Sequence, residues 1–149
     1  MQSIGSHACS MCSSLELVSI QSDIKWIGES AFYSCKNMQV LTFPKKAEGL
    51  AIGESAFSYC QRIKTLAVPD GVVSIGRNAF IFCESLTTLT FPSSLRSIPE
   101  YSFQNCSSLL KYVVKPLPLN IHAYYLAHTH AHTHAHPQPH PPTHVRTTR

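Results

Sequence analysis

An Ile-Gly dipeptide recurs along this 149-residue chain at intervals of 23 to 25 residues, and no other feature constrains the fold as strongly. A unit of this length is too short to bury both of its faces, so consecutive units must stack against one another. The period therefore predicts a repeat solenoid. Its units open at Ile4, Ile27, Ile52, Ile75 and Ile98, the last being followed by proline.

Aligned on the opening Ile, the units share the pattern I-G-x-x-A-F-x-x-C-x-x-L-x-x-L-x-F-P. From the Ala to the first Leu, the apolar spacing favours one face of a short helical turn. From the second Leu the spacing falls to two, which is typical of a strand with one buried side, and proline then ends the strand. We therefore expect the α/β class: about five coils of strand, Ile-Gly corner and helical turn, with a parallel sheet on the concave side and short helical turns opposite.

This pattern resembles the leucine-rich repeats of the BspA-like type, over residues 4 to about 121. Departures fall in the outer units: Cys9 replaces Phe, and Pro99 and Ser102 replace Gly and Ala, as terminal repeats often do. The resemblance implies a leucine-rich-repeat solenoid in residues 1–121. The family is similar to surface and secreted proteins of protists, algae and anaerobic bacteria. In these proteins such arrays are thought to act in adhesion and binding rather than catalysis.

Five of the six cysteines stand eight residues after the opening Ile, at Cys12, Cys35, Cys60, Cys83 and Cys106. Free cysteine packs as a small apolar residue, so a column of structural thiols is the first interpretation. Disulfides between adjacent coils are a second. A third is a zinc site at the Cys9-Cys12 pair, for which His7 is the near histidine.

Residues 122–149 have a different composition, rich in His and Pro and poor in apolar side chains, which predicts a disordered low-complexity tail. Two interpretations of its histidines stand side by side. Alternate imidazoles can chelate Zn²⁺, Ni²⁺ or Cu²⁺, while a run of alternating dinucleotides translated by chance would leave only adventitious metal binding. The histidines concerned are His128, His130, His132, His134 and His136.

Charge and motifs exclude several classes of function. Residues 1–113 carry nine basic and eight acidic side chains, so they lack the positive field that nucleic acids require. No run approaches the ~20 apolar residues of a membrane span, and we expect no signal peptide before the first repeat. Localisation is left open, with the cell surface or secretion expected if the chain is part of a longer family member. Without a phosphate loop, H-E-x-x-H or G-x-S-x-G motif, we expect no enzyme and no cofactor.

The outward positions of the predicted strands are the expected contact surface, because stacking presents them as one patch. Small and β-branched residues dominate there, although such residues also suit a strand without any binding role. We therefore expect a non-catalytic interaction or adhesion module that binds a protein or a glycan, with end-to-end self-association as a further partner mode. The alternatives are a scaffold that displays a metal-chelating tail and a truncated, nonfunctional fragment. The expected contact residues are Val40, Thr42, Thr65, Ala67, Thr88, Thr90, Lys111 and Val113.

Overall fold

The computed structural model of the protein describes residues 2–21, 23–95, 97–109 and 111–114. These residues form short β-strands joined by turns, and they contain no helix. Coils are numbered below from their opening residues Ile4, Ile27, Ile52, Ile75 and Ile98. The strands are β1 (Gln2–Ile4), β2 (Leu17–Ser19), β3 (Ile24–Ile27), β4 (Val40–Thr42), β5 (Lys46–Ile52), β6 (Thr65–Ala67), β7 (Asp70–Ile75), β8 (Thr88–Phe91) and β9 (Lys111–Val114).

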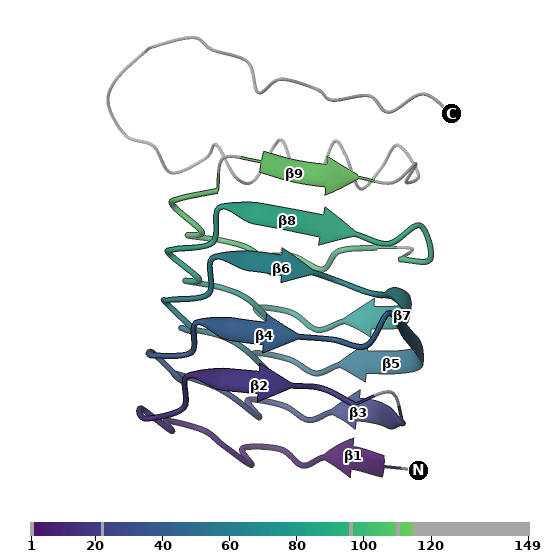
Figure 1. The fold of residues 1–149 in the computed structure, drawn as a ribbon, viewed down its shortest axis with the longest axis horizontal. Helices are drawn as coiled ribbons and strands as arrows, with labels where there is room; N and C mark the ends of the chain where they lie inside the picture. The colour runs from purple at the N-terminus through teal and green to yellow at the C-terminus, as the bar shows by residue number, and fades with distance from the viewer. Residues whose placement is uncertain (1, 22, 96, 110, 115–149) are drawn as a thin grey trace, which may run out of the picture.

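The strands lie on two opposite sides of the stack, and those of the two sides run in opposite directions (Figure 1). One side, the back sheet, has the order β1-β3-β5-β7. The other side, the front face, consists of the pair β2-β4 and the sheet β6-β8-β9. Every pairing is parallel. The parallel-strand solenoid is thus confirmed, but strands occupy both sides of the stack instead of the one that the sequence indicated.

The back strands end at the Ile of each Ile-Gly pair, and the Gly follows where the chain enters the turns. Ile27 pairs with Ile52, and Ile52 with Ile75, so the opening Ile of each of these coils is the last residue of a back strand. Alternation of buried and exposed residues is broken at Glu48–Gly49 in β5 and at Val73–Ser74 in β7. Gly49 and Gly71 have φ of 76° and 91°. The register of β5 on β7 shifts near the same glycines. A period of two is therefore lost in the sequence, which is why the back strands were missed.

The segments expected as helical turns are series of tight turns in the described residues. Each coil has two non-glycine residues with positive φ, three and seven positions after the opening Ile. An α-helix does not contain such residues, because left-handed φ costs about 1–2 kcal/mol for an L-residue. The helical turns are therefore not confirmed. The predicted number of about five coils and the predicted start of the tail at residue 122 depend on residues outside the described part of the chain.

Hydrogen bonding between coils explains why these turns are preferred. In the second coil the amides of Ser30, Phe32 and Ser34 donate to carbonyls of the third coil at 2.8–2.9 Å. The amides between them, of Ala31 and Tyr33, donate within the coil to the carbonyls three residues back, at 3.3 and 3.1 Å. Alternate amides thus face the neighbouring coil, so the turn side of the solenoid is also joined by backbone hydrogen bonds and leaves few buried donors unpaired.

A column of phenylalanines runs through the core, five residues after each opening Ile. Phe32, Phe57, Phe80 and Phe103 stack in sequence with ring centroids 5.2 Å apart and ring planes within 6° of parallel. This spacing follows the strand separation of about 4.8 Å. Cys9 holds the equivalent position in the first coil, so the aromatic column begins at the second coil.

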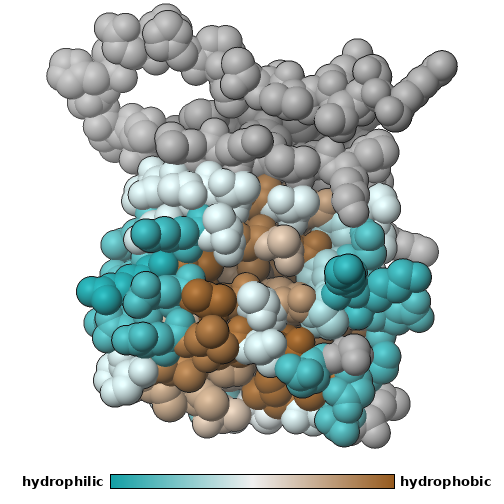
Figure 2. Space-filling view, in the orientation of Figure 1, coloured by the Kyte–Doolittle hydropathy of each residue, from teal (hydrophilic) through white to brown (hydrophobic). Residues whose placement is uncertain are grey.

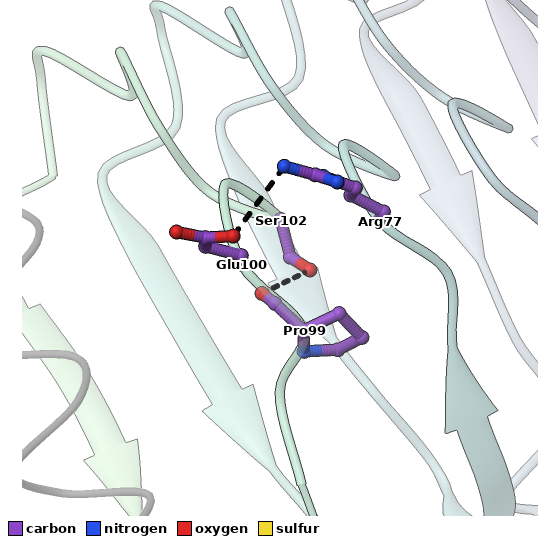
Figure 3. A network of polar contacts seen from close by, with 4 residues as sticks. All are labelled: Arg77, Pro99, Glu100 and Ser102. Carbon is purple, nitrogen blue, oxygen red and sulfur yellow. Dashed lines mark hydrogen bonds and ion pairs between the residues drawn. The ribbon is translucent and has the colours of Figure 1, made fainter.

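The junction between the fourth and fifth coils accommodates the two departures from the repeat (Figure 3). The buried hydroxyl of Ser102 donates to the carbonyl of Pro99 at 2.8 Å, with the Gly76 carbonyl at 3.3 Å. On the surface, Arg77 Nη2 lies 3.4 Å from Glu100 Oε2. Pro99 has no N–H to match the bonds that Gly28, Gly53 and Gly76 donate to preceding coils. Among the described residues, the back sheet ends at β7.

Candidate binding face

The front face presents two rows of outward side chains, as the alternation in sequence predicted. In β4 and β6 the central residues Leu41 and Leu66 are buried and their neighbours are exposed. Parallel register aligns Thr65 with Thr88 and Lys111, and Ala67 with Thr90 and Val113. The backbone therefore brings the predicted contact positions together, although the side chains of Lys111 and Val113 lie outside the description.

A break divides this face between β4 and β6, which belong to different sheets. It coincides with the one 25-residue interval of the repeat, between Ile27 and Ile52. An open groove of about 270 Å³ lies there. Its lining includes five of the eight predicted contact residues but not Val40: the lining residues are Leu41, Thr42, Phe43, Thr65, Leu66, Ala67, Thr88 and Thr90.

Apolar side chains gather over the front strands, and hydrophilic ones flank them on both sides (Figure 2). Leu17 is 59% exposed and Val40 is 42% exposed. Both belong to the β2-β4 pair, in which they are register partners. A contiguous apolar surface rimmed by polar residues is typical of a contact site for another molecule.

The chemistry of the groove is that of recognition. Its lining combines threonine hydroxyls, which both donate and accept hydrogen bonds, with the aliphatic and aromatic surface of Leu41, Phe43 and Leu66. No acid, base or thiol lines it. A threonine hydroxyl acts as a nucleophile only with a base beside it, and no side-chain base lines the groove. This lining is therefore suited to holding a ligand.

Sequence reasoning missed the contribution of Leu41, Phe43 and Leu66 to this groove. An unbroken sheet would hide Leu41 and Leu66 beneath the outward rows. The 25-residue interval between the opening residues of the second and third coils was the available signal, because it coincides with the break between β4 and β6. The sequence pattern also did not predict that two apolar residues of the back sheet, Trp26 and Val73, are exposed.

The cysteine column has a structural role that the geometry makes explicit. The Sγ atoms of Cys35, Cys60, Cys83 and Cys106 lie 3.1–3.5 Å from the carbonyl oxygen at the phenylalanine position of the preceding coil and donate to it. All six cysteines are free thiols in the structure. Burial raises the pKa of Cys35 to about 11 and that of Cys60 to about 12. Because the thiolate is the nucleophile and metal ligand, these thiols are inert near neutral pH.

The metal sites considered from sequence are not assembled in the described part of the chain. No three His, Cys, Asp or Glu side chains group there in a way that could hold a metal ion, and this includes the surroundings of Cys9, Cys12 and His7. The tail ligands His128, His130, His132, His134 and His136 lie outside the described residues. None of the described residues belongs to a helix that could span a bilayer.

A family of BspA type leucine rich repeat regions, matched in six copies, covers residues 48–135. Among solved structures, the chain is similar to a leucine rich cell surface protein from Faecalibacterium prausnitzii. The two are 30% identical with a TM-score of 0.71, and the match covers 82% of this chain and 32% of that one. No curated protein matches the chain.

Two further leucine-rich repeat structures share the fold. One, from Bacteroides ovatus, is 27% identical with a TM-score of 0.53, over 74% of this chain and 34% of that one. The other, from T. pallidum, is 20% identical with a TM-score of 0.58, over 87% of this chain and 77% of that one, and it supports the fold alone. The chain spans about a third of the length of the F. prausnitzii and B. ovatus proteins.

Proposed function

Because this chain belongs to the BspA-type leucine-rich repeat family, we propose that it is a non-catalytic interaction module whose front face binds another polypeptide. The observation that carries the proposal is the groove between β4 and β6, open within an apolar face and lined by five of the residues selected from sequence. The similar F. prausnitzii protein is described as a cell surface protein, and this favours an adhesion role for the same kind of contact.

A polypeptide fits this face better than a glycan, the other partner class considered from sequence. A partner that covers the exposed side chains of Leu17 and Val40 stabilises the complex mainly by burying apolar surface. This contributes about 25 cal/mol per Å² of apolar surface buried. Backbone amides and carbonyls of a peptide can also form hydrogen bonds with the threonine hydroxyls of the groove. The described face is small, so the affinity of one copy should be modest and should rise when copies are arrayed.

Selection from a library of short random peptides displayed on phage tests this proposal directly. Ala67→Arg places a long charged side chain in the groove, whereas Ser74→Arg makes the same change at an exposed position of the back sheet. Peptides selected on the unmodified protein should lose at least about tenfold in affinity for the Ala67→Arg variant. They should bind the Ser74→Arg variant as before.

Two outcomes would overturn the proposal. One is selected peptides that bind both variants equally, which would place their contact elsewhere. The other is a face that yields no peptides but binds an oligosaccharide from a glycan array, which would make the partner a glycan. Deletion of residues 128–149 separates the tail from this function, because peptide binding should survive the deletion while any metal binding by the tail histidines should be lost.

A further inference from the structure

A second depression, of about 320 Å³, lies beside the groove and differs from it in charge. Gln39, Arg62, Lys64 and Ser85 line it. It adjoins the groove along the chain, since Lys64 lines one depression and Thr65 the other. Gln39 likewise directly precedes β4. The two depressions are therefore parts of one surface, one apolar and the other cationic.

Burial of the intervening residue directs both cations outward. Ile63 is 1% exposed, whereas Arg62 and Lys64 on either side of it are exposed. The backbone around them is held by the fourth coil: Thr87 donates to the Lys64 carbonyl from its amide at 2.8 Å and from its hydroxyl at 3.0 Å. The two side chains thus project from a fixed segment, which reduces the entropy cost of holding a ligand between them.

No carboxylate lines the cationic depression. The nearby acid on the fourth coil, Glu84, accepts a hydrogen bond from the Gln61 amide at 3.2 Å. Among the residues that the structure describes, the ion pair is Arg77 with Glu100, and neither Arg62 nor Lys64 forms one. Neither cation of this depression is therefore held in an ion pair by a neighbouring side chain.

The repeat does not require cations at these two positions. At the offset of Arg62, other coils have Ser14, Asn37, Ser85 and Ser108. At the offset of Lys64 they have Glu16, Gln39, Thr87 and Leu110. A charged pair that occurs in one coil and adjoins the groove is better explained by a ligand than by the stability of the stack.

We propose that the Arg62–Lys64 depression binds a carboxylate of the polypeptide that occupies the groove, so that the partner segment carries an acidic side chain close to an apolar one. The inference rests on the proposed function of the front face. The planar guanidinium of Arg62 suits a carboxylate through paired hydrogen bonds, and the Lys64 ammonium adds a second charge. Gln39 and Ser85 supply neutral hydrogen-bonding groups at the edges.

The same peptide selection tests the inference with a matched pair of charge variants. Arg62→Gln with Lys64→Gln removes two positive charges from the depression, and Lys45→Gln with Lys46→Gln removes two from exposed positions at the start of the back strand β5. Peptides selected on the unmodified protein should be enriched in Asp and Glu. Their affinity should fall about five- to tenfold for the first double variant and stay unchanged for the second.

The outcomes separate this inference from the proposed function. Peptides that lack acidic residues overturn only the acidic partner. The same holds for peptides that tolerate the Arg62→Gln, Lys64→Gln variant but still lose affinity for the Ala67→Arg variant. Peptides that respond to neither change overturn both. Heparin that binds through Arg62 and Lys64 while no acidic peptide does would make the anionic ligand a sulfated glycan instead of a polypeptide.

Discussion

The first coil, residues 4–26, and the inner coils that open at Ile27, Ile52 and Ile75 share one repeat but differ in what covers them. Ala8 is exposed, whereas the matching Ala31, Ala56 and Ala79 are completely buried. Each inner coil is covered on one side by the coil before it, and no described residue covers the first coil in this way. The comparison shows which repeat residues serve their own coil and which serve the contact with a neighbour.

Glycine separates these two roles most clearly. A Cβ on Gly76 would lie 2.4 Å from the Glu54 amide nitrogen of the preceding coil, and one on Gly53 would lie 2.7 Å from the Ile27 carbonyl oxygen. A Cβ on Gly5 would meet nothing within 4 Å. None of these glycines has a positive φ. The glycine is therefore needed for the close approach of the preceding coil and not for its own backbone conformation.

The largest expected difference concerns the aromatic column. Phe57→Ala empties a fully buried site between Phe32 and Phe80 and should lower the free energy of unfolding by about 3–5 kcal/mol. Cys9→Ala, at the same offset of the first coil, removes a much smaller side chain at the end of the column and should cost about 1 kcal/mol or less. Urea unfolding followed by circular dichroism measures both. Equal losses would show that the end of the stack is as tightly packed as its middle.

The glycine comparison predicts the next largest difference. Gly76→Ala forces the new methyl group against backbone atoms that cannot rotate away, so it should destabilise the protein by about 3 kcal/mol. Gly5→Ala should change stability by no more than about 0.5 kcal/mol. Thermal unfolding of the two variants provides the test. A strongly destabilised Gly5→Ala variant would mean that another coil, from this chain or a second copy, covers the first one.

The smallest expected effect comes from the buried thiols at alkaline pH. Burial raises the pKa of Cys60 from 9.0 to about 12, so above pH 9 the unfolded chain releases a proton that the folded chain retains. The contribution of this thiol to stability is complete below pH 9 and falls by up to about 1.4 kcal/mol per pH unit above it.

Paired cysteine variants isolate that contribution from other groups that titrate at high pH. The loss of stability between about pH 8 and about pH 10 should be smaller by about 1 kcal/mol in Cys60→Ala than in the unmodified protein. Cys12→Ala, which changes an exposed thiol of the first coil, should leave the loss unaltered. The midpoints of urea unfolding at the two pH values measure these losses of stability. The same loss in all three proteins would contradict the buried, neutral state of Cys60.

Local residue patterns were sufficient to predict the front strands. The alternation around Leu41, Leu66 and Leu89 marks one buried and one outward side, and the structure places these leucines inward. The back strands are harder to predict, because their alternation is broken at Glu48–Gly49 in β5 and at Val73–Ser74 in β7. In sequence, these turns resemble helical turns because both bring residues three or four apart to the same side. The two differ in the carbonyl to which each amide donates its hydrogen bond.

By itself, the sequence determined the period, the columns of Phe and Cys and the family, because each depends on which residues recur at a fixed offset. Tertiary structure decided where the pairing of the front strands is interrupted, which is between β4 and β6. The groove between β4 and β6 and its cationic neighbour at Arg62 and Lys64 arise from how one coil rests on another. Residues 23 to 25 positions apart then become neighbours at hydrogen-bonding distance, as Thr87 and the Lys64 carbonyl do at 2.8 Å. The 25-residue interval in the sequence coincides with the loss of pairing between β4 and β6, and the surface to which binding is assigned lies at this break.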